Sequence, residues 1–308
     1  MKKVSGNVLA IDIGGSKLVV GVTDLSGNII RMEKVLLPSS YDIRFLVEKI
    51  CRLAEKYCDG TVIAAGVTIP GLADAKNGVW LYAPFSGISD IEIAHVLGEK
   101  LNLKVFIDND VNACALAEKR YGACQNTDNF MWVTVSNGIG GALCLDGRLF
   151  AGERNSAGEI GHFIVNDRIK RRCGCGKYGC LEAMASGRGI SQTYFDKSGV
   201  FLSAEEISHK AAQGNREALE AFEVAGFYIG KAISYVINLL NIEHVIIGGG
   251  VSGSFTLMKT AINQAVNQYV FTQANPKVKL ERTKLGYYAA LLGCTAIVAE
   301  RIERGELQ

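Results

Sequence analysis

Two stretches of this chain share one order of strands and glycine turns. In the first, a strand-like run over residues 8–13 leads into Gly14-Gly15-Ser16-Lys17, and further strand-like runs follow over 18–23 and 29–37. In the second, a run over 130–135 leads into a glycine-rich turn and then another strand-like run. Apolar runs bounded by glycine and polar turns are typical of strands. The pattern predicts a duplicated architecture in which each half opens with a strand meander.

Helical spacing of apolar residues follows each meander. The expected helices cover residues 41–57, 91–101, 112–121, 204–212 and 216–240, and strand-like runs return at 61–69, 104–108 and 244–247. Strand–helix units after mixed meanders favour an α/β class with mixed sheets.

The length of 308 residues favours two domains. We expect a smaller first domain over residues 1–121 and a larger second domain over 122–287, with the boundary in the turn-rich stretch 122–129. A last helix, within residues 288–308, is expected to pack back on the first domain.

The charge balance and the cysteines limit the setting of the chain. With 33 basic and 31 acidic residues the net charge is +2, which argues against strong generic attraction to nucleic acid or anionic membranes. The apolar run near the N-terminus is interrupted at Asp12, too early for a signal peptide, and no apolar stretch reaches about 18 residues. The nine cysteines, an odd number, favour a reducing cytoplasm.

The two glycine turns are candidate phosphate loops. Glycines at Gly14 and Gly15 let backbone N–H groups approach an anion, Ser16 and Lys17 add contacts, and Asp12 suits Mg²⁺. The second turn, Ser136-Asn137-Gly138-Ile139-Gly140-Gly141, offers Asn137, Gly138 and Gly140 to the same phosphates. Either turn alone is as well explained as a hairpin. Equivalent places in a duplicated chain favour the phosphate interpretation.

A third glycine turn, with Gly248 and Gly249, follows the buried-type strand at 245–247. Ligands of α/β sheets bind beyond such strand ends, so a nucleotide base or ribose is expected here, with a plain strand–helix turn as the alternative.

Polar residues cluster where the strand at 104–107 gives way to a helix. Asp108-Asn109-Asp110-Val111-Asn112 can supply helix N-caps, but the cluster can also bind hydroxyls and remove a hydroxyl proton. We favour Asp110 as the base, because Asp108 belongs to the strand end.

A second polar group surrounds three close cysteines. Cys173, Cys175 and Cys180, together with His162, give the ligand set of a closed structural zinc site, with core cysteines as the alternative. Glu159, His162 and Glu182 can complete a hydrogen-bonding ring around a polyol, although an isolated glutamate is usually a surface residue.

Together these motifs resemble the ROK family of repressors, open reading frames and sugar kinases. The motifs that carry the resemblance are Asp12-Ile13-Gly14-Gly15-Ser16-Lys17, Ile69-Pro70-Gly71, Asn109-Asp110, Gly138-Ile139-Gly140-Gly141, Gly158-Glu159-Ile160-Gly161-His162, Cys173-Gly174-Cys175-Gly176, Gly179-Cys180-Leu181-Glu182 and Ile247-Gly248-Gly249-Gly250.

The resemblance implies an actin-like ATPase fold of the hexokinase, ribonuclease H-like type, with duplicated α/β domains and a central cleft. It also implies ATP-dependent phosphorylation of a hexose, usually at the 6-hydroxyl, by a homodimer. Asp110 would be the general base, with Gly71, Asn109, Glu159, His162 and Glu182 around the sugar. Zinc would sit on His162, Cys173, Cys175 and Cys180.

The chain departs from the family pattern at two places. Ser136-Asn137 stands where the family usually has Gly-Thr, and Ser86 lies in a sugar-side segment that often carries Asn or Trp. These departures leave the sugar open. The frequency of glucose kinases in the family makes glucose the first expectation for the substrate, with N-acetylmannosamine, fructose or allose as alternatives.

Two other functions are compatible with the family resemblance. Repressors of the family carry a helix-turn-helix domain ahead of the first glycine turn, where this sequence has eleven residues before Asp12. A DNA-binding role is therefore not expected. A non-catalytic sugar- or nucleotide-binding protein is the third interpretation, and Asp12, Lys17 and Asp110 argue against it.

Overall fold

The computed structural model describes residues 5–38, 40–83 and 87–307. The chain forms two compact units: unit 1 comprises residues 1–126, 149–157 and 285–308, and unit 2 comprises 127–148 and 158–284. The chain therefore passes between the units four times, and neither unit is one continuous segment. Unit 2 begins at Thr127 because the preceding turn stays tied to unit 1, where Gly122 N–H donates to the carbonyl of Glu118 at 3.1 Å.

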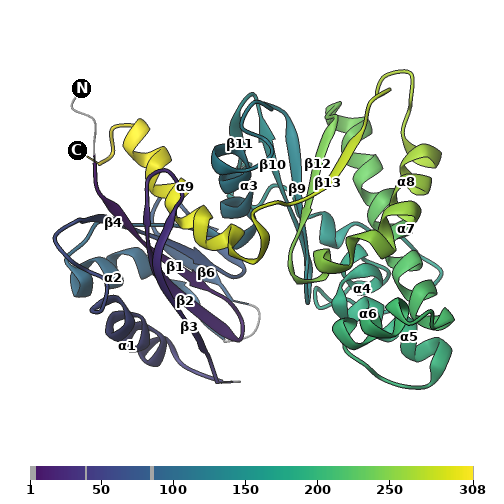
Figure 1. The fold of residues 1–308 in the computed structure, drawn as a ribbon, viewed down its shortest axis with the longest axis horizontal. Coiled ribbons are helices and arrows are strands. Elements are labelled where there is room, and N and C mark those ends of the chain that lie inside the picture. Colours follow the sequence, from purple (N-terminus) through teal and green to yellow (C-terminus); the bar gives the residue numbers. More distant parts are fainter. Residues whose placement is uncertain (1–4, 39, 84–86, 308) are drawn as a thin grey trace. The chain divides into compact units, whose positions relative to one another are not determined.

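Unit 1 is built on a five-stranded sheet of order β3-β2-β1-β4-β8 (Figure 1). The first three strands form an antiparallel meander, and β4 and β8 run parallel to β1. The strands are β1 Asn7–Ile13, β2 Lys17–Asp24, β3 Ile29–Leu36, β4 Val62–Ile69 and β8 Val105–Asn109. The register pairs Asp12 with Thr68 and Thr68 with Asp108, so the carboxyl ends of β1, β4 and β8 lie side by side.

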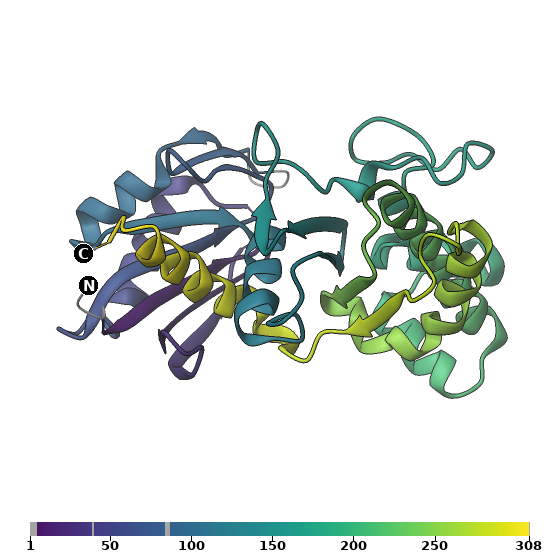
Figure 2. The same cartoon turned by 90° about the horizontal axis from the view of Figure 1, so that it is seen from above.

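Helices cover both faces of this sheet. The strand β1 alternates between them: Leu9 and Ile11 join the core under α1 and α2, whereas Val8 and Ala10 face α9. Both views show α9 lying along the sheet (Figures 1 and 2). The helices are α1 Ile43–Ala54, α2 Ile93–Leu101, α3 Asp110–Tyr121 and α9 Ala289–Glu303. The contact between α9 and β4 is very close, because a Cβ placed on Gly66 would lie 2.0 Å from the carbonyl oxygen of Cys294.

A small antiparallel sheet of unit 1 was not expected from the sequence. Its strands are β5 Leu72–Asp74, β6 Val79–Tyr82 and β7 Ser89–Ile91. Runs of three or four residues are too short to show a clear period-two pattern.

A second sheet, of order β11-β10-β9-β12-β13, repeats the arrangement, and apart from residues 149–150 of its edge strand β11 it belongs to unit 2. The strands β9 and β10 are antiparallel, and β12 runs parallel to β9 and to β13. The strands are β9 Phe130–Val135, β10 Ile139–Leu145, β11 Arg148–Phe150, β12 His244–Gly248 and β13 Lys279–Arg282. This second meander with parallel additions confirms the predicted duplicated α/β architecture.

The helices of unit 2 surround a core formed by one face of β9. Met131, Val133 and Val135 pack with Ile229 and Ile233 of α7. The helices are α4 Leu181–Ala185, α5 Gly187–Ser198, α6 Ala204–Ala212, α7 Arg216–Leu240 and α8 Phe255–Tyr269, with short 3₁₀ turns η1 Ile160–His162 and η2 Gly250–Ser254; a third such turn, η3 Gly286–Tyr288, lies in unit 1. The predicted helix over 216–240 matches α7, whereas α4, α5 and α8 had not been predicted. In the part of the chain that the structure describes, no helix is long and apolar enough to cross a bilayer.

Candidate functional site

A partly buried carboxylate, that of Asp12, lies near the end of β1. Thr68, on the neighbouring strand β4, donates its hydroxyl to Asp12 Oδ1 at 2.7 Å. Burial raises the pKa of Asp12, and the hydrogen bond from Thr68 opposes that rise. A divalent cation at this carboxylate would favour its ionised form, and carboxylate oxygen is a ligand that Mg²⁺ accepts. The residue present therefore fits the expected magnesium role.

The first glycine turn connects β1 to β2 and is open to solvent. Gly14 N–H donates to the carbonyl of Lys17 at 2.8 Å, which closes the turn, and Gly15 and Ser16 are exposed at its tip. The Nζ of Lys17 lies 5.8 Å from the ring centre of Tyr287. An exposed glycine turn with a cation beside it fits an anionic ligand.

The polar residues at the junction of β8 and α3 make different contacts. Asn109 is the N-cap of α3, and its Oδ1 accepts from the N–H of Asn112 at 2.7 Å. Asp108 is only 6% exposed, and burial raises its pKa against the effect of three hydrogen bonds, from Asn112, Asn155 and Asn109. The structure thus places the cap at Asn109 and a fully engaged carboxylate at Asp108. Asp110 directly follows Asn109 and is half-buried in the first turn of α3.

Gly71 lies two residues after the end of β4, the strand beside β8. Its φ of +88° is a conformation that glycine adopts readily and that other residues avoid. The segment 84–86, which includes Ser86, lies outside the described residues.

The second glycine turn is shorter than the sequence suggested. Only Ser136, Asn137 and Gly138 connect β9 to β10, and Ser136 N–H donates to the carbonyl of Gly138 at 2.8 Å. Gly140 lies inside β10, where it pairs with Thr134. The turn residues Asn137 and Gly138 thus keep loop geometry, whereas Gly140 is a strand residue.

Close packing accounts for the two glycines at the end of β12, Gly248 and Gly249. A Cβ on Gly248 would lie 2.2 Å from the Trp132 ring, and one on Gly249 would lie 2.4 Å from the carbonyl oxygen of Val135. Gly249 also has a φ of +84°. Their expected contact with a nucleotide base or ribose stays a prediction.

Three predicted polar residues of unit 2 gather near the cysteines. The η1 turn presents His162, whose Nε2 lies 3.8 Å from a carboxylate oxygen of Glu159. Glu182, in the first turn of α4, accepts from the N–H of Ile139 at 3.3 Å and reaches within 3.8 Å of the Cys173 sulfur. The Glu182 carboxylate therefore connects the second glycine turn to the cysteine cluster.

The geometry of the cysteine cluster suits a metal. The candidate ligand atoms of His162, Cys173, Cys175 and Cys180 all lie within 4.8 Å of one another. Cys173 Sγ is 3.7 Å from His162 Nδ1, and Cys175 Sγ is 3.7 Å from Cys180 Sγ. Ligand atoms of tetrahedral zinc are about 3.5–3.8 Å apart, given bonds of about 2.0–2.3 Å. The residues present therefore fit a closed Cys₃His site.

The thiols of the cluster differ in acidity. Burial raises the pKa of Cys173 to about 12, whereas the backbone N–H of Lys177 lowers the pKa of Cys175. A bound divalent cation would displace the thiol protons and hold the loop between η1 and α4 in place.

Comparison with known proteins decides the family. The chain matches the ROK family over residues 8–301. It is a member of the ROK family. The xylose repressor of Bacillus subtilis is 29% identical over 303 residues, which are 97% of this chain and 78% of that protein.

Solved structures of the family show the same fold. A ROK family transcriptional regulator, a homologue of the Escherichia coli Mlc protein, superposes with a TM-score of 0.89 at 28% identity, covering 98% of this chain and 79% of the regulator. A ROK family glucokinase from Streptomyces griseus, in complex with glucose and AMPPNP, gives a TM-score of 0.82 at 28% identity, covering 94% of this chain and 98% of the kinase. The ROK chain described here thus has the predicted actin-like ATPase fold, which its relatives use in kinases and in repressors.

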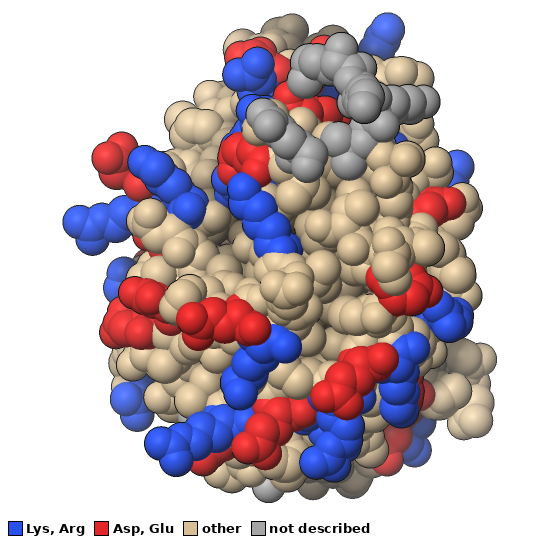
Figure 3. All heavy atoms as spheres, turned by 90° about the vertical axis from the view of Figure 1, so that its left-hand side faces the viewer, with Lys and Arg blue, Asp and Glu red and all other residues tan. Residues whose placement is uncertain are grey.

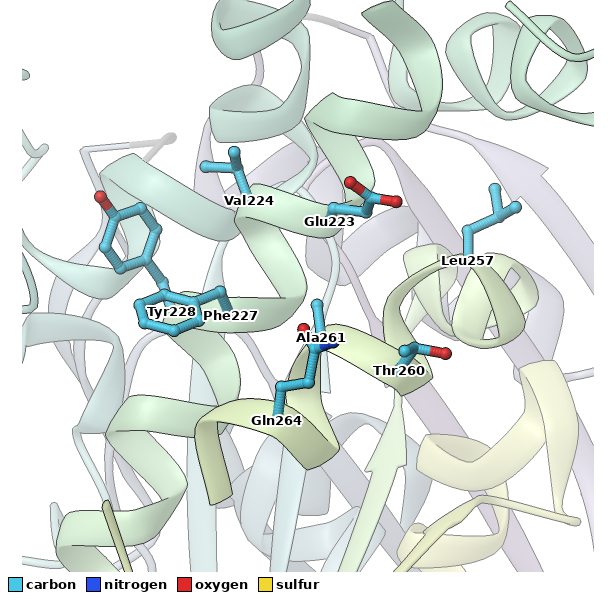
Figure 4. Close-up of a pocket in the computed structure, with 8 residues that line it drawn as sticks. All are labelled: Glu223, Val224, Phe227, Tyr228, Leu257, Thr260, Ala261 and Gln264. Atoms are coloured by element: carbon cyan, nitrogen blue, oxygen red, sulfur yellow. The ribbon is translucent and has the colours of Figure 1, made fainter. Parts of the chain in front are cut away.

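An open groove of about 490 Å³ lies away from the predicted residues, between α7 and α8 (Figure 4). It is lined by Glu223, Val224, Phe227, Tyr228, Leu257, Thr260, Ala261 and Gln264. No predicted site residue of this ROK protein lines it, so the groove is separate from the predicted site.

Sequence reasoning missed two residues that hydrogen-bond to the carboxylates of Asp12 and Asp108. Thr68 supports Asp12, and Asn155 donates to Asp108 at 3.0 Å. The position of Thr68, one residue before Ile69-Pro70-Gly71 at a strand end, is a signal that could have revealed it. Nothing local in the sequence points to Asn155, because the contact joins residues 47 positions apart.

Proposed function

We propose that this ROK protein is an ATP-dependent hexose kinase that transfers the γ-phosphate to a sugar hydroxyl, first of all the 6-hydroxyl of glucose. One observation carries the proposal. Asp12, a partly buried carboxylate suited to a cation, lies near the carboxyl end of β1, and Asp110, a candidate base, directly follows β8; these two strands flank β4 in one sheet. Binding a sugar requires neither group, whereas phosphoryl transfer uses both.

Each motif is proposed to serve one of the two ligands. The donor nucleotide would use Asp12 with Mg²⁺ and the first glycine turn of unit 1, and the second turn and Gly248-Gly249 of unit 2. Mg²⁺, when bound, supplies positive charge against the phosphate oxygens. The acceptor sugar would contact Gly71, Asn109, Asp110, Glu159, His162 and Glu182.

In the proposed reaction Asp110 accepts the proton of the attacking hydroxyl. The sugar oxygen forms a bond to the γ-phosphorus while the bond to the ADP oxygen breaks, so the products are a sugar phosphate and ADP. Positioning and electrostatic stabilisation supply most of the rate enhancement in such transfers.

The cysteine cluster is proposed as a structural zinc site that supports the sugar-binding residues. His162 turns Nδ1 toward the thiols, which leaves Nε2 facing Glu159. A histidine held this way can order the loop and still offer an N–H to a sugar hydroxyl. The proposal also includes a reducing cytoplasmic setting, in which the cysteines stay available to the metal, and a homodimer.

The resemblance to repressors of the family supports a second candidate, a sugar-responsive regulator. Charge argues against it: the net charge is +2, and basic and acidic side chains are interspersed on the face shown in Figure 3. Salt-sensitive, sequence-specific retardation of flanking genomic DNA in a gel shift, relieved by a sugar, would favour the regulator.

The kinase proposal is tested by ADP release with ATP and Mg²⁺ across glucose, N-acetylmannosamine, fructose, allose and amino sugars. We expect sugar-dependent ADP formation, strongest for one hexose. A protein that binds a hexose in calorimetry and yet releases no ADP with any member of the panel would not be a kinase.

A further inference from the structure

Asn155 has an unusual backbone conformation within a short excursion of the chain. It lies in residues 149–157, a segment that belongs to unit 1 although the chain on either side belongs to unit 2. Its φ is +56°, in the left-handed region. Asparagine adopts this region more readily than most residues, but its conformational energy there is still higher than that of glycine. The side chain should therefore contribute something that a glycine cannot.

The side-chain amide of Asn155 connects two other parts of unit 1. Its Nδ2 donates to Asp108 Oδ1 at 3.0 Å and to the carbonyl oxygen of Ala73 at 3.1 Å. Asp108 ends the buried part of β8, and Ala73 lies in β5. One amide thus holds together the segment 149–157, the small sheet and the large sheet of unit 1.

The oxygen of Asp108 that accepts from Asn155 also orders the start of α3. It accepts from the N–H of Asn109 at 2.7 Å and from Nδ2 of Asn112 at 2.9 Å. Since Asn109 Oδ1 is occupied by the N–H of Asn112, the side-chain amide group of Asn109 is the end left for a ligand. The orientation of that amide group depends on the network around Asp108.

Each contact of the Asn155 amide lies next to a residue proposed for the acceptor sugar. Ala73 is two residues after Gly71, and Asp108 is one residue before Asn109 and two before Asp110. Asn155 itself is four residues before Glu159. A shift of about 1 Å in such groups is enough to weaken binding and catalysis strongly.

We propose that Asn155 is a positioning residue for the acceptor sugar. Its side-chain amide holds Gly71, Asn109 and Asp110 in their relative positions through its hydrogen bonds to Ala73 and Asp108. The assignment of these residues to a sugar rests on the proposed function. The contribution of Asn155 is made before any nucleotide binds, so its loss should appear in sugar affinity without ATP.

The deciding variant is Asn155→Asp. Aspartate has nearly the same shape and also tolerates a positive φ, but it replaces the donor with a carboxylate facing Asp108. The Kd for a hexose is measured by calorimetry without ATP, with the hexose most active in the panel or with glucose if none is active. We expect this Kd to be about tenfold higher or more in the variant than in the wild type. The Kd for ATP should stay within about twofold, because the ATP-binding groups are not attached to this amide.

Exchanging the side chains at positions 108 and 155 distinguishes a positioning role of Asn155 from a general loss of stability. In the double variant Asn155→Asp with Asp108→Asn, the amide introduced at position 108 can donate to the carboxylate introduced at 155. We expect part of the lost sugar affinity to return. If Asn155→Asp fails to fold, Asn155→Gly keeps the backbone conformation, removes the amide and should give the same loss of sugar affinity.

Asn241 provides a matched control. Its φ is +53°, and its Nδ2 donates to Ala274 O at 3.0 Å and Asn275 Oδ1 at 2.8 Å, at the C-terminal cap of α7 in unit 2. Asn241→Asp should lower the melting temperature by a similar amount and leave sugar affinity unchanged. Unchanged sugar affinity in Asn155→Asp, or an equal loss in Asn241→Asp, would overturn the inference. A wild-type protein that binds the hexose but forms no ADP would contradict the kinase proposal alone.

Discussion

At the scale of single residues, neighbouring carboxylates at the β8–α3 junction have different surroundings. Asp108 is buried and engaged with three donors, whereas Asp110 is half-buried in the first turn of α3. Burial raises the pKa of Asp108, and the same burial, together with its three hydrogen bonds, keeps this carboxylate from contact with a substrate. The same segment therefore contains a structural carboxylate and a candidate base only two positions apart.

Asp110→Asn tests that assignment. The amide keeps the shape and the hydrogen-bonding reach of the side chain but cannot accept the hydroxyl proton, so kcat should fall by about 10²–10⁴. Sugar Kd should stay within a few-fold of wild type. Steady-state kinetics and calorimetry measure both, and Glu205→Gln, an exposed carboxylate in the first turn of α6, serves as the control. Near-normal turnover of Asp110→Asn would remove this residue from the role of base.

Thr68→Val should change the pH dependence through Asp12. The Thr68 hydroxyl opposes the effect of burial on the Asp12 pKa, so removing it raises that pKa further. The ionised form that suits Mg²⁺ is then lost at higher pH as the solution is acidified. We expect the acid limb of the kcat/KM profile to move to higher pH, and Thr68→Ser to keep the wild-type profile. An unmoved limb in the valine variant would show that Asp12 does not control it.

At the scale of elements, the proposed zinc site would order the loop between η1 and α4, which carries Cys173 and Cys175. Cys175 is the exposed cysteine of the four ligands, so Cys175→Ser removes a thiolate with little loss of packing. Elemental analysis should find about one zinc per wild-type chain and far less in the variant, with a lower melting temperature. Cys58→Ser, an exposed cysteine in unit 1, should keep the metal. Full zinc content in the Cys175 variant would exclude this ligand set.

The contact between α9 and the sheet of unit 1 leaves no room for a side chain at Gly66. A Cβ there would meet the backbone of Cys294, which cannot move as a flexible side chain can. Gly66→Ala should therefore lower the free energy of unfolding by about 3 kcal/mol or more in denaturant titrations. Gly60→Ala, where nothing lies within 4 Å of the added Cβ, is the control. Equal stability of the two variants would mean that α9 does not pack as described.

At the scale of the whole molecule, each unit has its own hydrophobic core. The core of unit 2 includes Leu181, which follows the candidate ligand Cys180 at the start of α4. The core of unit 1 lies around Leu9 and Ile11. Removing the metal with a chelator should increase hydrogen exchange around η1 and α4 and leave β1 and β4 protected. Mass spectrometry of exchanged peptides measures this, and added zinc should restore protection. A uniform increase over β1 and β4 would contradict independent cores.

The sequence predicted the elements with strong periodicity and the residues that belong to local motifs. The helix over 216–240 and the strand over 130–135 coincide with α7 and β9, and the three cysteines with His162 are brought together as a ligand set. The roles of Asp110 and the other site residues remain predictions. Elements of three or four residues, such as β5, are too short for the alternating pattern of a strand to be recognised.

Long-range contacts were out of reach of sequence patterns. The hydrogen bond of Asn155 to Asp108 depends on the chain returning to unit 1 for residues 149–157, which no local spacing indicates. Gly140 illustrates the reverse case: the glycine-rich run suggested a longer loop, but pairing with Thr134 places it in β10. Backbone pairing thus decided where the loop ends.

The position of α9 in the chain has a consequence for biosynthesis. The residues of β1 and β4 are made early, whereas the helix that covers one of their faces follows all of unit 2. A ribosome must therefore release residues beyond 289 before Val8 and Ala64 can be shielded from water. Until then the nascent chain carries an uncovered apolar sheet surface, the kind of surface that chaperones hold and that premature termination would leave open to aggregation.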